Sequence, residues 1–346
     1  MVKIDFFDST LRDGLHATKQ KISVEFIEDY CQAMDYAGME TIIIGHGNGL
    51  GASSLQVGLS SIHESEMLKI ARDTLEKTKL GVYMIPGFGT IKDNLIPAID
   101  YGVDLFIIGS HATEADTTKQ HIQFLISQGK EVYGVLMMYH MASTEKILEE
   151  CLKIQEYGAN GVILMDSAGA STPELVKRTI NTLYEGLNIK IGFHAHNNLG
   201  LAVSNSYIAI QEGASIIDGT LRGFGAGAGN CQLEALVALL EKNEIKTRAE
   251  LYTMLDASEY VMPEIMQKEM GIDPISIVSG MSGVFSAFKF PVLKAAREFN
   301  VDPKDIFKEL GRRKVVGGQE DMIIEVAENL SNRRVSDIDY YLESLL

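Results

Sequence analysis

Residues 189–198 read Ile-Lys-Ile-Gly-Phe-His-Ala-His-Asn-Asn, an apolar run that leads into two histidines, His194 and His196. Side chains alternate between the two faces of a β-strand, so both imidazoles are expected on the same face of this predicted strand. Two neutral imidazoles that converge from one rigid strand form half of a divalent-metal site. The stretch therefore predicts a buried strand with a metal site at its end, and we expect the remaining ligand, a carboxylate, at another strand end.

Apolar and β-branched runs of the same kind recur along the chain, with segments of helical periodicity between them. The predicted strands cover residues 3–7, 41–44, 80–85, 105–108, 132–138, 162–165, 189–193 and 215–217. A glycine precedes several of these strands, where a left-handed helix end is expected, as at Gly38, Gly102 and Gly158. Eight alternating units over about 240 residues predict an α/β protein with a (β/α)8 TIM barrel rather than an open doubly wound sheet.

The pattern changes after about residue 242. Residues 247–270, 285–300, 303–312 and 319–330 have helical periodicity, and no further strand of comparable strength follows. We expect a catalytic barrel domain over residues 1–244 and a helical C-terminal domain over residues 245–346 that serves as substrate lid and partner-docking region. Residues 276–290, rich in glycine, serine and aromatic residues, are expected to reach back over the barrel mouth.

The composition excludes several classes of protein. The chain has 346 residues, of which 46% are hydrophobic, and a formal net charge of -16, which argues against binding to nucleic acid or to an acidic membrane surface. Its three cysteines are far apart and form no CxxC pair, so neither a disulfide framework nor a zinc knuckle is expected. The sequence contains neither a secretion-type leader nor a long apolar span, so we expect a cytoplasmic protein.

The end of the first predicted strand supplies the missing ligand. Residues 8–16 read Asp-Ser-Thr-Leu-Arg-Asp-Gly-Leu-His, and catalytic groups of TIM barrels lie at the carboxyl ends of the strands. Asp13 can complete a site of two histidines and one carboxylate, which leaves positions on an octahedral ion for water and for a 2-oxo acid. Arg12 can hold the oxygen on which negative charge develops, and His16 can transfer a proton.

Other polar residues fall at strand ends, but the sequence does not fix their roles. His46 follows the second run and His111 the fourth, whereas Asp166 and Asp218 follow the sixth and the eighth, either as supports of the metal site or as caps. The glycine run at 223–229 has the spacing GxGxGxG and follows the last strand, which does not match a dinucleotide-binding site. It favours a loop whose backbone N–H groups face an anion or the metal-site waters, with close backbone packing as the alternative.

Several segments carry a family resemblance. Residues 8–14, 194–200 and 225–230 resemble the superfamily of metal-dependent barrel lyases and condensing enzymes that includes isopropylmalate synthase and hydroxymethylglutaryl-CoA lyase. Residues 46–54, 137–141 and 309–322 are similar to the segments of one branch, the 4-hydroxy-2-oxovalerate aldolase family. The resemblance covers nearly the whole chain, including the helical tail.

The resemblance implies a mechanism and partners. It implies Mn²⁺, or Mg²⁺ or Co²⁺, on Asp13, His194 and His196, with Arg12 as the stabiliser of a pyruvate enolate. His16 is then the base that takes the proton of the C4 hydroxyl, so that the C3–C4 bond of a 4-hydroxy-2-oxo acid breaks to an aldehyde and pyruvate. An acylating aldehyde dehydrogenase is implied as a partner that docks partly on the helical tail and receives the aldehyde through a channel, and we expect an oligomer.

Two positions depart from the family pattern. The family usually has a tyrosine where Phe285 stands and a serine where Tyr139 stands, while Tyr83 and Ile85 occupy the positions of its chain-length residues. We expect these four side chains, with His46, to line the substrate pocket. The hypothesis is that Tyr139 fills this pocket and alters the preferred size or stereochemistry of the substrate.

Two alternatives remain beside a metal-dependent aldolase. One is a condensing enzyme that uses an acyl-CoA and a 2-oxo acid, as in isopropylmalate or homocitrate synthases, although those usually have Gly-Glu-Gln where this chain has Gly14-Leu15-His16. The other is a catalytically silent barrel that regulates a dehydrogenase, which the presence of all five predicted site residues disfavours.

Overall fold

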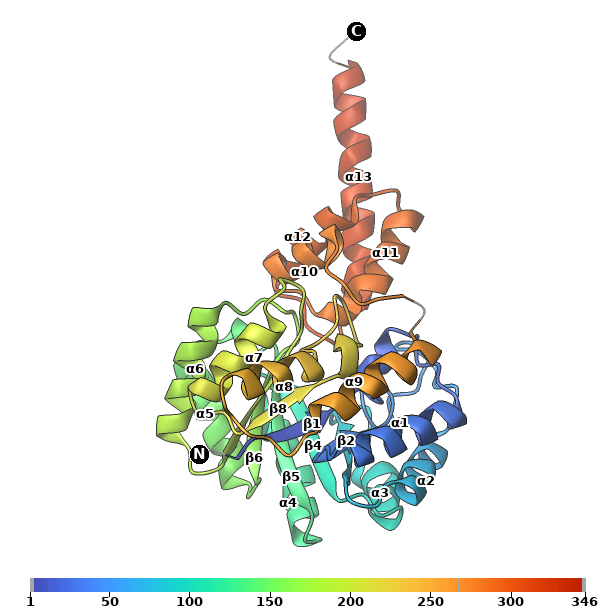
Figure 1. The fold of residues 1–346 in the computed structure, drawn as a ribbon. Coiled ribbons are helices and arrows are strands. Elements are labelled where there is room, and N and C mark those ends of the chain that lie inside the picture. The colour runs from blue at the N-terminus through green and yellow to red at the C-terminus, as the bar shows by residue number, and fades with distance from the viewer. Residues whose placement is uncertain (1–2, 267, 344–346) are drawn as a thin grey trace.

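The computed structural model describes residues 3–266 and 268–343, and its centre is a closed barrel of parallel strands (Figure 1). The strands are β1 (Asp5–Asp8), β2 (Thr41–Ile43), β3 (Lys79–Met84), β4 (Leu105–His111), β5 (Glu131–Met137), β6 (Gly161–Asp166), β7 (Lys190–Ala195) and β8 (Ile216–Gly219). Each strand pairs with the next, and β8 pairs with β1. The predicted TIM barrel is confirmed, and every predicted run overlaps one strand.

Helices connect the strands and cover the outside of the barrel (Figure 1). They are α1 (Val24–Tyr36), α2 (Glu64–Thr74), α3 (Ile96–Asp100), α4 (Lys119–Ser127), α5 (Thr144–Glu156), α6 (Pro173–Gly186), α7 (Ala202–Gln211) and α8 (Leu233–Lys242). The start of α6 shows how the sequence sets these boundaries. Thr172 accepts a hydrogen bond from the backbone N–H of Leu175, and Pro173 stands in the first turn, where no backbone N–H is needed.

Alternation along each strand divides the barrel core into two parts. One set of side chains fills the interior, as Phe7, Tyr83 and Tyr133 do. The other set, which includes Phe6 and Phe193, packs against the helices. Strands of a parallel sheet are buried on both faces in this way. The face on which a residue at a strand end lies therefore follows from its place in the alternation, as long as the strand geometry persists.

The C-terminal part contains a second core. It is built by α10 (Pro274–Ser282), α11 (Lys289–Glu298), α12 (Pro303–Arg312) and α13 (Asp321–Glu343). Its buried residues include Val292, Phe307 and Val326. These helices stand at one end of the barrel, and α13 extends away from it (Figure 1).

Along the chain, the barrel core continues beyond residues 244 and 245, where the domain boundary was predicted, and the helical core begins only later. Helix α9 (Leu251–Tyr260) packs against α1, and Met254 and Met262 are fully buried in the core of the barrel. Only part of the predicted helix at 247–270 is helical in α9. Residues 276–290 begin inside α10, whose N-cap Asp273 accepts a hydrogen bond from the backbone N–H of Ser276. Further along this segment, the backbone N–H of Ser286 donates to the carbonyl of Ser167, the residue directly after β6, at 2.9 Å. Within residues 3–266 and 268–343, no helix has both the length and the apolar character needed to cross a bilayer.

Candidate active site

The three predicted metal ligands lie together at the carboxyl end of the barrel strands. His194 belongs to β7 and His196 follows it, and their Nε2 atoms are 3.4 Å apart. Asp13 begins the short 3-10 helix that follows β1. The ligand atoms of these three buried residues all lie within 4.8 Å of one another. One carboxylate and two imidazole nitrogens form a donor set that fits a divalent cation.

Asp218 supports this cluster from the neighbouring strand. It stands opposite His194 in the register of β7 and β8, and its Oδ2 lies 3.1 Å from Nδ1 of that histidine. A carboxylate at this place favours the proton on Nδ1 and so leaves the lone pair of Nε2 for a metal. Asp166, in contrast, accepts hydrogen bonds from the backbone N–H groups of Ala170 and Ser171 and so holds a loop. The structure thus gives Asp218 and Asp166 different roles, which the sequence alone did not distinguish.

The glycine run of residues 223–229 wraps the carboxylate of Asp13. Asn230 donates a hydrogen bond of 2.6 Å from Nδ2 to Oδ2 of Asp13, and the backbone N–H of Ala226 donates another of 3.4 Å. A methyl group on Gly225 would lie 2.6 Å from the same oxygen. The anion that this loop faces is therefore the Asp13 carboxylate. The backbone of Gly225 comes so close to this carboxylate that only a glycine fits there. The role of Asn230 was not predicted, although it ends the motif of residues 225–230.

Charge keeps Asp13 ionised. Burial opposes its ionisation, but the neighbouring His196 and Arg12 hold the pKa of the carboxyl below its ordinary value. Nη1 of Arg12 donates to Oδ1 of Asp13 at 3.1 Å. Asp13 is thus a carboxylate, the form in which it can bind a metal.

Arg12 is buried and fixed by several partners. Its Nη2 donates to Oγ of Ser9 at 3.2 Å, and its Nη1 donates to the carbonyl of Gly47 at 3.3 Å. Within the described part of the chain, its Nε–H group is buried without a hydrogen-bond partner. A buried donor without a partner is costly, so a substrate oxygen is a suitable acceptor for it.

His16 ends the same 3-10 helix and is half-buried. Burial, together with the positive charge of Arg12, lowers the pKa of its imidazole below the ordinary value, although Asp13 acts in the opposite direction. A neutral imidazole near pH 7 can accept a proton. His16 lines a cavity that also contains Asn48 and Phe285.

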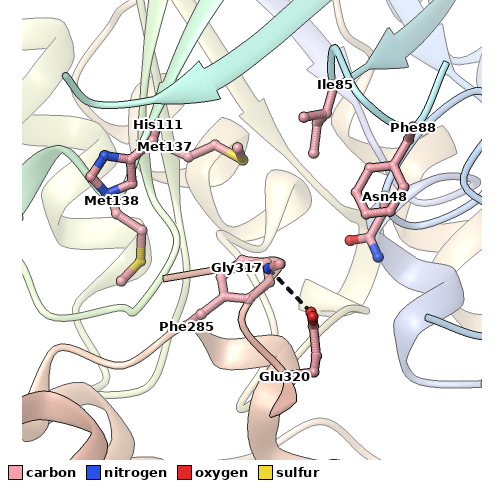
Figure 2. Close-up of a pocket in the computed structure, with 10 residues that line it drawn as sticks. Asn48, Ile85, Phe88, His111, Met137, Met138, Phe285, Gly317 and Glu320 are labelled. Carbon is pink, nitrogen blue, oxygen red and sulfur yellow. Dashed lines mark hydrogen bonds between the residues drawn. The ribbon is translucent and has the colours of Figure 1, made fainter. Parts of the chain in front are cut away.

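A second, neighbouring cavity lies between the strand ends and the second core (Figure 2). It is lined by Asn48, Ile85, Phe88, His111, Met137, Met138, Phe285, Gly317, Gly318 and Glu320. Phe285, Gly317 and Glu320 face Ile85, Phe88 and Asn48 across it (Figure 2). The wall is largely apolar, with a few polar groups. Of the lining residues from the C-terminal part, Phe285 was predicted. Gly317, Gly318 and Glu320 were not, because their position depends on how the helical part packs against the barrel.

The predicted pocket residues fall into two groups. Ile85 and Phe285 line this cavity. Tyr83 lies deeper in the barrel interior, only 2% exposed, and its hydroxyl donates to the sulfur of Met137 at 3.2 Å.

Tyr139 does not fit its predicted place in the pocket. It is 1% exposed and packs edge-on against Phe193 at 6.1 Å, in the layer between barrel and helices. The reason is Met138, which has a left-handed backbone with φ of 56° directly after β5. This turn breaks the alternation, so Met138 lines the cavity and Tyr139 turns outward.

His46 also has a different role from the predicted one. It is fully buried, its Nε2 donates to the carbonyl of Gly58 at 3.0 Å, and its Nδ1 accepts from the backbone N–H of Asn48 at 3.0 Å. Burial lowers the pKa of His46 to about 4, so the ring stays neutral and can make both bonds. His46 therefore shapes the loop that carries Gly47 and Asn48.

Comparisons with known proteins agree with this geometry. Residues 3–261 match the HMGL-like family, and residues 270–332 match the DmpG-like communication domain. The 4-hydroxy-2-oxovalerate aldolase of Pectobacterium atrosepticum is 50% identical over 337 residues, which are 97% of this chain and 98% of that protein. The chain belongs to the 4-hydroxy-2-oxovalerate aldolase family.

A second member of this family, from Spirochaeta aurantia, is also 50% identical and covers 94% of this chain and 96% of its own. Membership makes the chain a carbon–carbon lyase of the aldolase type, with a site for a divalent metal. Neither a condensing enzyme nor a silent barrel is favoured by these matches.

Solved structures support the fold. The HMG-CoA lyase of Bacillus subtilis superposes with a TM-score of 0.64 at 19% identity, over 78% of this chain and 96% of that one. The carboxyl transferase domain of Rhizobium etli pyruvate carboxylase gives a TM-score of 0.80 at 14% identity, over 96% of this chain and 61% of that one. At these identities the likeness concerns the fold alone.

Proposed function

We propose that this aldolase cleaves a 4-hydroxy-2-oxo acid into pyruvate and an aldehyde. The observation that carries the proposal is the cluster of Asp13, His194 and His196, whose ligand atoms lie within 4.8 Å, directly beside the buried guanidinium of Arg12. The names of the relatives support the same class of substrate.

The metal would be Mn²⁺, with Mg²⁺ or Co²⁺ as substitutes, held by Asp13, His194 and His196. When bound, it supplies a Lewis acid for the carboxylate and keto oxygens of the 2-oxo acid. Arg12 donates to the C2 oxygen, where negative charge develops as the C3–C4 bond breaks.

His16 acts as the base of the reaction. Its neutral imidazole accepts the proton of the C4 hydroxyl, C4 becomes the aldehyde carbon, and the electron pair of the broken C3–C4 bond forms the enolate of pyruvate. A proton delivered to C3 then completes pyruvate. In the reverse direction the same groups join pyruvate to an aldehyde.

The cavity between the barrel and the second core is proposed to hold the part of the substrate that becomes the aldehyde. Its walls of Ile85, Met138 and Phe285 are apolar and exclude water from the reacting carbons. Phe285 offers no hydroxyl to orient that group, so selection there rests on shape.

We further infer an acylating aldehyde dehydrogenase as partner, docked on the second core, and an oligomeric assembly in the cytoplasm. The support is the match of residues 270–332 to a communication domain. An aldehyde released at the cavity of Phe285 and Glu320 would then leave beside the docked partner.

The test is a pyruvate-release assay on 4-hydroxy-2-oxo acids that differ in aldehyde chain length, with Mn²⁺ and with a chelator. We expect release that depends on Mn²⁺ and is abolished in Asp13→Ala. Absence of pyruvate with Mn²⁺ present would refute the proposal. An acetyl-CoA-dependent release of free thiol would instead identify a condensing enzyme.

A further inference from the structure

Tyr83 lies directly beneath the guanidinium of Arg12. Its position on β3 directs the side chain into the barrel interior, and Cζ of Arg12 stands over its ring, 4.8 Å from the centroid. The bonds of Arg12 to Asp13, Ser9 and Gly47 all start from N–H groups, which lie in the plane of the guanidinium. These hydrogen bonds therefore hold the edges of the guanidinium, whereas the ring of Tyr83 contacts its flat face.

The ring of Tyr83 is itself held from several sides. A methyl group on Gly109, in β4, would lie 2.1 Å from the phenol oxygen, so this glycine provides the room that the hydroxyl occupies. The hydroxyl donates to the sulfur of Met137 on β5 at 3.2 Å. A methyl group on Gly49 would lie 2.4 Å from the backbone carbonyl of Tyr83. Because the ring of Tyr83 has so little freedom to move, it can hold the guanidinium of Arg12 in one orientation.

We propose that Tyr83 is a positioning residue for Arg12. The aromatic face sets the plane of the guanidinium, so that the Nε–H group without a partner points to the place of the substrate oxygen. A cation over an aromatic ring gains more when both are removed from water, and both residues are buried here. Tyr83 acts through Arg12, and its own side chain is only 2% exposed. The inference rests on the proposed function, in which Arg12 stabilises the enolate.

The test isolates enolate formation from the rest of the reaction. Exchange of the C3 protons of pyruvate with D2O, followed by NMR with Mn²⁺ and without aldehyde, requires the enolate but no occupant of the aldehyde cavity. Tyr83→Phe keeps the ring, and we expect its exchange rate to stay within about twofold of the wild type. Tyr83→Leu removes the ring and should lower the maximal exchange rate about 5- to 30-fold, with a nearly unchanged KM for pyruvate.

Tyr133→Leu is the matched control. Tyr133 is another buried tyrosine of the barrel interior, 1% exposed, but it packs edge-on against Phe7 and donates to Glu131 near the start of β5. Its loss should lower the melting temperature as Tyr83→Leu does and leave the exchange rate at the wild-type level. If the exchange rate fell equally in Tyr83→Leu and Tyr133→Leu, the assay would report only the stability of the barrel, and the proposal would be wrong.

Two further variants separate the outcomes. Gly109→Ala keeps Tyr83 but displaces its ring, and it should slow exchange even if Tyr83→Leu does not fold. In an Arg12→Lys background, Tyr83→Leu should have little additional effect, because the guanidinium that it positions is absent. Equal exchange rates in Tyr83→Phe and Tyr83→Leu would overturn the inference. So would a Tyr83→Leu substitution that slows exchange as much in the Arg12→Lys background as in the wild type. Absence of exchange in the wild type would contradict the proposed function instead.

Discussion

The imidazole of His16 lies against the backbone of Gly47 so closely that a methyl group on Gly47 would stand 2.7 Å from its Nε2. The carbonyl of the same glycine accepts a hydrogen bond of 3.3 Å from Arg12. Gly47 thus lies between the proposed base and the proposed stabiliser of the enolate. Because Gly47 has no side chain, the imidazole of His16 can pack directly against the backbone whose carbonyl binds Arg12.

Gly47→Ala should therefore displace His16. A misplacement of about 1 Å is expected to lower kcat about 10- to 100-fold, while the affinity for Mn²⁺ stays close to that of the wild type. Steady-state kinetics and calorimetric titration of the apo protein measure the two quantities. Gly271→Ala is the control, because a methyl group there would meet no atom within 4 Å. An unchanged kcat in Gly47→Ala would show that His16 has room to adjust.

The pH profile should report the neutral form of His16. Burial and Arg12 lower the pKa of this imidazole below 6.5, so the base stays neutral to a lower pH than an exposed histidine would. The acid limb of kcat/KM is expected below pH 6.5, with activity lost as the pH falls through the lowered pKa and retained above it. His16→Ala should lower kcat about 100- to 10,000-fold and remove this limb. An acid limb above pH 6.5 would contradict the assignment.

Asp218 should affect the metal rather than the fold. Asp218→Ala is expected to weaken Mn²⁺ binding about 10- to 100-fold, because Nδ1 of His194 loses the carboxylate that orients it. Asp218→Asn should weaken binding less, since the amide oxygen can still accept a hydrogen bond from Nδ1–H of His194. Asp166→Asn alters another buried carboxyl at a strand end and should leave the affinity unchanged. Similar affinities in all three variants, measured by calorimetry, would rule out this role for Asp218.

The two aromatic departures from the family pattern should behave differently. Phe285→Tyr adds a hydroxyl to the cavity wall and should change the preference among aldehydes or the stereochemistry of the aldol product. Tyr139→Ser should leave that preference alone and lower the free energy of unfolding by about 3 kcal/mol, because it empties space in the layer between barrel and helices. Competition between aldehydes and chemical denaturation separate the two effects. A change of preference in Tyr139→Ser would mean that the outward packing of Tyr139 still governs the cavity.

The sequence predicted the parts of the site that depend on local periodicity. His194 and His196 converge because strand alternation is regular, and Asp13 lies at a strand end because the first apolar run stops there. The expected pocket position of Tyr139 rested on the family resemblance, and hydrophobic periodicity gives no sign of the left-handed turn at Met138 that directs Tyr139 away from the cavity. Glu320 and Gly317 were not assigned to the cavity, since their approach to Asn48 depends on packing between segments far apart in the chain.

One side of the cavity wall and the predicted metal site belong to different hydrophobic cores. Phe285 packs with the helical core, whereas Asp13, His194 and His196 stand on the barrel. We therefore expect the smaller helical core to melt first on heating, after which the barrel would still bind Mn²⁺ but no longer enclose an aldehyde. The temperature of inactivation would then report the stability of the helical core and lie below the melting temperature of the barrel.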